Sequence, residues 1–239
     1  MIGVYDSGLG GLMLLKHIRK SFPNETILYL GDRKNAPYGT KTREELTAIF
    51  NKNIDFFKRH NVKDLVIACN TLCSIIDFNE VEDIVLHDII SKTVKQVNLS
   101  KDATLLVLAT PLSIEAGRYK YELEKLGYKN CIYKALPKLA GLIERFSSED
   151  EIYAYLSEEF KTINHKIDGI VLGCTHYPIV NDIFLRFFNV PIYNSNELSF
   201  DLTDSNDGGK LLMCVDKSYE LEDFINRYVQ LDFEYFNYD

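Results

Sequence analysis

Short apolar runs alternate with amphipathic segments along the whole chain. Apolar residues recur every three or four positions over 12–22 and again after Thr42, which predicts two helices. Thr42 and Glu45 form a capping box that marks the start of the second helix. The continuous apolar runs between these segments are typical of buried strands. Strands are therefore predicted over 2–7, 26–32, 64–70 and 84–90.

The same alternation restarts in the second half of the chain. Strands are predicted over 104–110, 131–137, 169–175 and 191–195. Helices are predicted over 113–126, after a second capping box at Ser148 and Glu151, and over 210–231 at the end. Strands that alternate with helices in this way predict mostly parallel sheets covered by helices on both faces.

The restart predicts an α/β protein made of two similar, pseudo-symmetric α/β domains. We expect residues 1–95 and 206–239 to build the first domain and residues 96–205 to build the second. Polar clusters follow nearly every predicted strand, and ligands of such folds gather at the carboxyl ends of strands. The active site is therefore expected in the cleft between the two domains.

Composition and charge narrow the function classes. The 239 residues carry 27 basic and 35 acidic side chains, a net charge of −8, without a Lys/Arg cluster of the kind that nucleic-acid binding requires. The longest apolar runs are much shorter than the roughly 20 residues of a membrane span. The start, MIGVYDSG, lacks the features of a signal or transit peptide. We expect a cytoplasmic protein without nucleic-acid or membrane partners, whose anion sites consist of backbone N–H groups and hydroxyls.

Two of the five cysteines share one local pattern. Cys69, in VIACNT, and Cys174, in VLGCTH, each follow two aliphatic residues and a small residue, and each precedes a polar pair that includes threonine. A single cysteine in such a place is usually core filling, but two in the same frame favour a function. Cys73, Cys131 and Cys214 are interpreted as structural, and the odd, irregular set predicts reduced thiols.

Two opposed thiols suit one reaction in particular. A thiolate is a good base only when its pKa is lowered, and a place just before a helix N-terminus favours negative charge. One cysteine could then remove a proton from one face of a carbon while the other returns a proton to the opposite face. The predicted reaction is racemisation without a cofactor, because the glycines of GLGG are only a fragment of a dinucleotide fingerprint.

Two other classes of function stay open at this point. Cys69, Cys73, Cys174 and His176 could form a zinc site, although their spacing differs from that of zinc ribbons. A non-catalytic amino-acid-binding or regulatory protein on the same fold is the second alternative. The aromatic end FEYFNYD is interpreted as packing against the body of the protein.

Five motifs follow one another along the first 180 or so residues: DSGLGG from Asp6, GD at Asp32, PYG from Pro37, ACNT around Cys69 and LGCTHYP around Cys174. Taken together and in this order, they resemble the motifs of the glutamate racemases, in the aspartate/glutamate racemase superfamily. The resemblance implies an isomerase that interconverts L- and D-glutamate without cofactor or metal and supplies D-glutamate for peptidoglycan and cell-wall synthesis. It also implies a homodimer and two catalytic cysteines, Cys69 and Cys174.

The resemblance assigns further roles residue by residue. Residues that assist the thiols are matched by Asp6, Asp32, Glu144 and His176. Substrate-binding residues are matched by Asp6, Ser7, Pro37, Tyr38, Gly39, Asn70, Thr71, Thr110, Thr175 and His176.

The chain also departs from the family pattern. Leu112 and Ser113 follow Thr110-Pro111 where a Gly-Thr pair is usual. The segment before Glu144 reads ALPKLAGLIE where a Cys-Pro pair and a second proline are common, and Asn194 stands where an aspartate is typical. Both thiols are unaffected by these changes. Aspartate, or a broader set of amino acids, therefore remains an alternative substrate.

Overall fold

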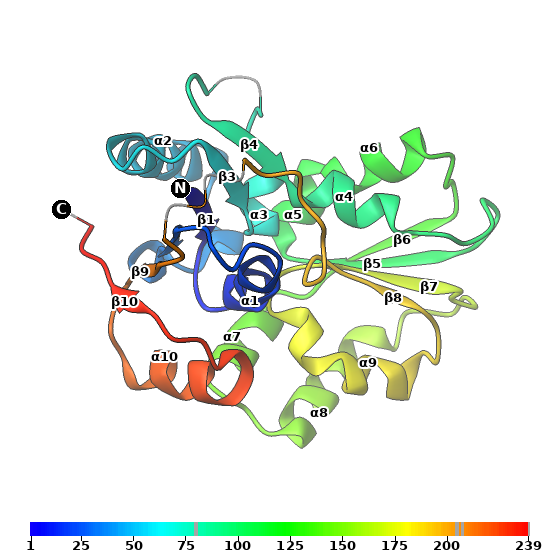
Figure 1. The fold of residues 1–239 in the computed structure, drawn as a ribbon. Helices are drawn as coiled ribbons and strands as arrows, with labels where there is room; N and C mark the ends of the chain where they lie inside the picture. Colours follow the sequence, from blue (N-terminus) through cyan, green and yellow to red (C-terminus); the bar gives the residue numbers. More distant parts are fainter. Residues whose placement is uncertain (79–80, 204–205, 207, 239) are drawn as a thin grey trace.

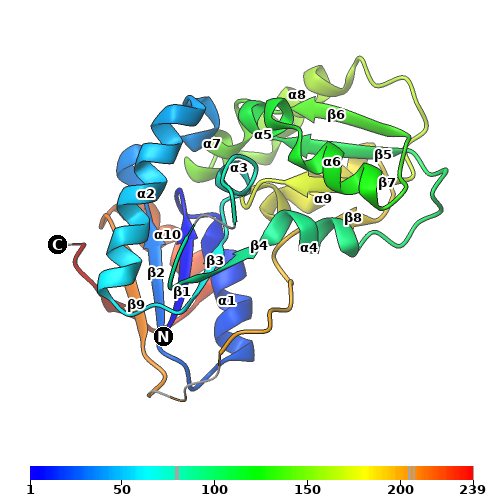
Figure 2. The same ribbon diagram turned by 90° about the horizontal axis from the view of Figure 1, so that it is seen from above.

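The strands of the protein form two parallel sheets, one of six strands and one of four. The computed structural model describes residues 1–78, 81–203, 206 and 208–238. The two sheets belong to two lobes that lie side by side (Figure 1). Seen from above, short helices lie between the lobes (Figure 2). The predicted α/β class with two mostly parallel sheets is confirmed.

The first sheet has the order β10-β9-β2-β1-β3-β4. Its central strand β1 is buried along its whole length, as are its neighbours β2 and β3. Parallel strands covered on both faces read as continuous apolar runs, which is why the sequence pattern located them. The strands are β1 (Ile2–Asp6), β2 (Ile27–Gly31), β3 (Asp64–Ile67), β4 (Val85–Asp88), β9 (Leu211–Val215) and β10 (Glu234–Tyr235).

The second sheet repeats the inner four strands of the first. Its order β6-β5-β7-β8 matches β2-β1-β3-β4 strand for strand, so β7 corresponds to β3. This matching order confirms the predicted pseudo-symmetry. The strands are β5 (Leu105–Ala109), β6 (Cys131–Ala135), β7 (Gly169–Gly173) and β8 (Ile192–Tyr193).

Helices cover both faces of each sheet (Figures 1 and 2). In the first lobe α2 lies on one face, and α1 and α10 lie on the other. In the second lobe α4 and α6 lie opposite α8 and α9. The helices are α1 (Gly11–Ser21), α2 (Arg43–Arg59), α3 (Asn70–Cys73), α4 (Ile89–Lys95), α5 (Pro111–Ala116), α6 (Arg118–Lys125), α7 (Leu139–Glu144), α8 (Glu149–Phe160), α9 (Asn181–Phe187) and α10 (Tyr219–Phe224).

The capping residues in the sequence marked where α2 and α8 begin. The capping box at the start of α2 is complete, with both the Thr42 hydroxyl and the Glu45 carboxylate bonded to backbone N–H groups. The box at Ser148 is only half formed: its hydroxyl accepts from the Glu151 N–H, whereas the Glu151 carboxylate accepts from Arg145.

Two predicted helices were wrong in part. The helix expected over 113–126 is interrupted at Gly117, whose φ of +70° is a left-handed conformation that ends α5 before α6 begins. The helix expected from residue 210 begins only at Tyr219. Leu211–Val215 is instead the strand β9, because this continuous apolar run pairs in parallel with β2 and is largely buried there.

The chain passes from the first lobe to the second after β4. Helix α4 already packs against α6 and β7 of the second lobe. The domain boundaries at 95 and 205 stay a prediction, and residue 205 lies outside the described residues. In the ranges that the structure describes, no helix has both the length and the apolar character needed to cross a membrane.

Candidate active site

The two matching cysteines occupy equivalent places in the two lobes. Cys69 follows β3 and directly precedes α3, and Cys174 directly follows β7, the corresponding strand. Both thiols line one cavity of about 320 Å³ between the lobes. The cavity is also lined by ten other residues singled out in the sequence: Ser7, Pro37, Tyr38, Gly39, Asn70, Thr71, Thr110, Glu144, Thr175 and His176.

Cys69 is held as a buried thiol. Its Sγ donates to the Ser7 hydroxyl oxygen at 3.6 Å. Burial, and next the negative charge of Asp6, raise its pKa to about 12, although the Leu72 N–H favours the thiolate. The expectation that the helix start would lower the pKa of this thiol was wrong, because desolvation of the charged form outweighs the N–H group.

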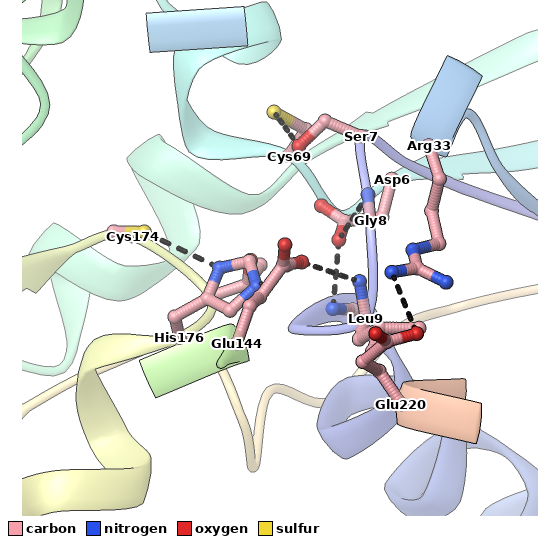
Figure 3. A network of polar contacts seen from close by, with 12 residues as sticks. Asp6, Ser7, Gly8, Leu9, Arg33, Cys69, Glu144, Cys174, His176 and Glu220 are labelled. Carbon is pink, nitrogen blue, oxygen red and sulfur yellow. Dashed lines mark hydrogen bonds and ion pairs between the residues drawn. The ribbon is translucent and has the colours of Figure 1, made fainter. Parts of the chain in front are cut away.

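Cys174 lies beside a buried imidazole. The Nδ1 atom of His176 is 3.7 Å from the Cys174 Sγ, and its Nε2 is 2.9 Å from the Glu144 Oε1 (Figure 3). Burial opposes protonation of His176, but the hydrogen bonds with Cys174 and Glu144 overcome it and raise the pKa of this imidazole well above its ordinary value. A protonated His176 would stabilise a thiolate at Cys174.

Glu144 links the second lobe to the first. Besides His176, its Oε1 accepts from the backbone N–H of Leu9 at 3.2 Å. Burial opposes its ionisation, but the His176 contact outweighs it and lowers the pKa of the carboxyl to about 2. The glycine turn makes this approach feasible, since a Cβ on Gly8 would lie 2.5 Å from the Glu144 Oε1. A Cβ on Gly10 would likewise lie 2.4 Å from the Thr175 Oγ1 and 2.7 Å from the His176 Nδ1.

Asp6 and Asp32 lie behind the cavity and do not line it. The Oδ2 atom of Asp6 accepts from the N–H groups of Gly8 and Gly11, which fixes the turn that carries Ser7. Burial raises the pKa of Asp6. Asp32 accepts a hydrogen bond of 2.6 Å from Tyr38, so it contacts the cavity wall from the outside.

Hydroxyl and amide groups of both lobes meet on the cavity wall. The Oγ1 atoms of Thr71 and Thr110 are 2.9 Å apart across the cleft, and Ser113 supports Thr110 at 2.9 Å. The Asn70 Oδ1 accepts from the Tyr119 hydroxyl at 2.5 Å, whereas its Nδ2 has no partner among the described residues. These groups could donate to a carboxylate in the cavity. Ser113 thus supplies a hydroxyl at the place where the chain departs from the family pattern.

Sequence reasoning missed two cationic side chains. Lys138 and Arg145 line the cavity, although only hydroxyls and backbone groups were expected there. Both lie close to Glu144 in the sequence, and that proximity was the only signal for them. The Arg145 guanidinium is paired with Glu151 at 2.5 Å. In the part of the chain that the structure describes, no three His, Cys, Asp or Glu side chains are grouped to hold a metal ion.

Comparisons with known proteins agree with this arrangement. The family model described as Asp/Glu/Hydantoin racemase matches residues 13–203. A glutamate racemase of Clostridium botulinum is 40% identical over 191 residues, which cover 76% of this chain and 72% of the relative.

Solved structures extend the likeness to the complete chain. A glutamate racemase isoform from Bacillus anthracis has a TM-score of 0.90 at 26% identity and covers 100% of this chain and 97% of its own. The Francisella tularensis enzyme, solved in complex with D-glutamate, has a TM-score of 0.85 at 26% identity, with 98% and 95% covered. With a family model matched over most of its length, the chain belongs to the Asp/Glu/Hydantoin racemase family and is an amino-acid racemase, an isomerase.

Proposed function

We propose that the protein is a glutamate racemase that interconverts L- and D-glutamate by proton transfer between Cys69 and Cys174. The observation that carries this proposal is the pair of thiols, delivered by equivalent strands of two lobes into one cavity. The glutamate racemases to which the chain is similar support the choice of substrate. By resemblance, the product D-glutamate supplies peptidoglycan synthesis in the cytoplasm, and the active form is a homodimer.

The two thiols have different surroundings before substrate enters. Cys69 is a neutral thiol at neutral pH, because its pKa is raised to about 12. Cys174 has the imidazole of His176 beside it, and a protonated imidazole stabilises a thiolate there. One thiolate removes the α-proton, and the thiol on the other side donates its proton to the opposite face of the same carbon. The two sulfurs exchange states in each turnover, so no net proton is consumed.

Groups on the cavity wall hold the substrate during this exchange. The hydroxyls of Thr71, Thr110 and Thr175 and the free Nδ2 of Asn70 are suited to donate to the two carboxylates of glutamate. Fixed donors around the carboxylate next to the reacting carbon would also stabilise the charge that develops when the α-proton leaves.

Two supporting carboxylates act through other residues. Glu144 holds the imidazole of His176, which lies beside Cys174. Asp6 holds the turn that places Ser7 against Cys69.

The test is racemisation by metal-free enzyme, followed by circular dichroism with L-glutamate and L-aspartate in separate reactions. In D₂O, deuterium should enter the α-carbon of the product. Cys69→Ser and Cys174→Ser should each abolish steady-state turnover, while Cys131→Ser, a change at the start of β6 that does not line the cavity, should retain it.

Each alternative gives a distinct result. Product formed without deuterium exchange would exclude proton abstraction, and faster turnover of aspartate would reassign the substrate. Tight binding of glutamate without any turnover would identify a binding protein. Light scattering of the purified protein checks the proposed homodimer.

A further inference from the structure

The aromatic segment 233–238 is docked on the first lobe by backbone pairing and by ring stacking. Its strand β10 pairs with β9, and the Phe236 N–H continues that ladder to the Met213 carbonyl at 2.8 Å. The Tyr238 ring stacks on Phe56 of α2, with centroids 4.7 Å apart and planes 6° apart. This geometry places the Tyr238 hydroxyl at a defined point over α2.

The Tyr238 hydroxyl bonds to the buried amide of Asn53. It donates to the Asn53 Oδ1 at 2.5 Å. The other end of that amide, Nδ2, donates to the Tyr5 hydroxyl at 2.6 Å and to the Asp32 Oδ2 at 3.3 Å. Asn53 is only 3% exposed, and with Asp32 and Tyr238 it lines a second pocket that is open to solvent.

The hydrogen bonds among Tyr5, Tyr38 and Asp32 can be donated in only one direction. Tyr38 donates its single hydroxyl proton to the Asp32 carboxylate, so the 2.6 Å bond between Tyr5 and Tyr38 must be donated by Tyr5. Tyr5 in turn accepts from Asn53. The donor chain, defined as Tyr238, Asn53, Tyr5, Tyr38 and Asp32, therefore starts on segment 233–238 and ends at a carboxylate behind the cavity.

The far end of the donor chain forms part of the substrate cavity. Tyr38 and Gly39 line it, and Gly39 packs so closely on Thr110 of the second lobe that a Cβ would lie 2.9 Å from the Thr110 Cβ. A shift of Tyr38 would therefore move the contact between Gly39 and Thr110 across the cleft.

We propose that Tyr238 is a positioning residue, which holds the Asn53 amide in the orientation that keeps Tyr38 and the loop 33–41 at the cavity wall. The Tyr238 hydroxyl donates to the oxygen of the Asn53 amide and so fixes which end of the amide faces it. When this hydroxyl is removed, the amide loses the hydrogen bond that keeps its two N–H groups directed at Tyr5 and Asp32. The effect on turnover rests on the proposed function, whereas the effect on the loop does not.

The decisive variant is Tyr238→Phe, which keeps the ring on Phe56 and removes only the hydroxyl. Tyr235→Phe is the matched control, because Tyr235 lies in the same segment, is 40% exposed and packs against Phe233. Backbone hydrogen exchange of loop 33–41, read by mass spectrometry, reports its position without any substrate. Steady-state racemisation of glutamate gives kcat and KM separately.

We expect Tyr238→Phe to speed exchange of loop 33–41 and to lower kcat/KM about 3- to 10-fold, as loss of one neutral hydrogen bond allows. Tyr235→Phe should change neither. In a Tyr38→Phe background, Tyr238→Phe should have no further effect on turnover, because the donor chain is already broken. Asn53→Leu keeps a similar size but removes both inner donors without adding a charge beside Asp32, so it should release the loop even if Tyr238→Phe proves unstable.

The possible failures are separable. Unchanged exchange of loop 33–41 in both Tyr238→Phe and Asn53→Leu would overturn the inference, even if the wild type racemises glutamate. Faster loop exchange in a protein that does not racemise glutamate would refute the proposed substrate and support the positioning role. A lower kcat/KM with unchanged loop exchange would also overturn the inference, because the hydroxyl would then act by another route.

Discussion

Replacing Glu144 with glutamine tests the electrostatics of the site most directly. The Glu144 Oε1 is 2.9 Å from the His176 Nε2, with side chains 27% and 6% exposed. Glutamine preserves the size of the side chain and an acceptor oxygen, but it removes the negative charge. The change therefore isolates the charge of Glu144 from its packing.

The expected shift in the pKa of His176 follows from the strength of one charge-assisted hydrogen bond. Burial alone would lower the pKa of this imidazole, and its bonds to Cys174 and Glu144 raise it instead. A hydrogen bond to a charged group contributes roughly 1.5–3 kcal/mol, and one pKa unit corresponds to about 1.4 kcal/mol. Glu144→Gln should therefore lower the pKa of His176 by about 1 to 2 units, toward the lower end because Glu144 is partly exposed.

The assay is an NMR titration of ¹⁵N-labelled histidine, with His176 assigned as the signal that His176→Asn removes from the five histidines of the chain. Glu159→Gln is the matched control, because Glu159 pairs with Lys134 at 2.7 Å and has a similar exposure of 23%. It should leave the titration of His176 unchanged. A His176 pKa in Glu144→Gln within about 0.3 unit of the wild type would refute the reasoning.

The pair of Glu144 and His176 also predicts how the free energy of unfolding changes with pH. The pKa of His176 is raised on folding, so its contribution is complete below its ordinary value of 6.5 and is lost as pH rises through the folded value. The pKa of Glu144 is lowered, so its contribution is complete above 4.5 and is lost as pH falls toward about 2. Denaturant unfolding of the wild type and Glu144→Gln should differ most between pH 4.5 and 6.5. A difference that grows as pH rises above 6.5 would contradict this.

Three further predictions concern single positions. Alkylation of Cys69 by iodoacetamide, followed by peptide mass spectrometry, should speed up with each pH unit without a plateau at mildly alkaline pH, because its pKa is about 12; a plateau near its ordinary value would contradict this. Gly10→Ala should lower the free energy of unfolding by about 1–3 kcal/mol and reduce turnover by displacing Thr175 and His176. The control is Gly141→Ala, whose added Cβ would meet open space; it should not lower the free energy of unfolding. Thr110→Val should raise KM for glutamate about 10-fold with less effect on kcat, because it removes the hydroxyl that bonds to Thr71 and Ser113. A normal KM would show that this hydroxyl does not contact the substrate.

Much of the fold was predictable because its signals are local. The strands β1, β3 and β7 are continuous apolar runs, and the start of α2 is marked by Thr42 and Glu45 within four residues. The left-handed Gly117 was missed because the residues around it have helical character on both sides. Strand β9 was missed because an isolated apolar run is compatible with either a strand or a helix, and only its pairing with β2 decides between them.

The candidate site was predictable as a set of residues but not as a geometry. Its motifs, with two cysteines 105 positions apart, pointed to the residues that line the cavity. They did not show that Asp6 supports the turn behind Ser7 or that Lys138 lines the cavity. They also gave the wrong direction for the pKa of Cys69, because burial is not a property of its neighbours in sequence.

The sequence alone determined the alternation of strands and helices, the repeat of that pattern in two halves and the presence of a thiol at the end of one strand in each half. These follow from periodicity and from contacts between residues a few positions apart. Only the tertiary structure decided that the two thiols share a cavity, that Glu144 holds His176, and that Tyr238 reaches Asn53. Those contacts join residues far apart in the chain, and the desolvation and hydrogen bonding that set their chemistry arise only when the two lobes and segment 233–238 pack together.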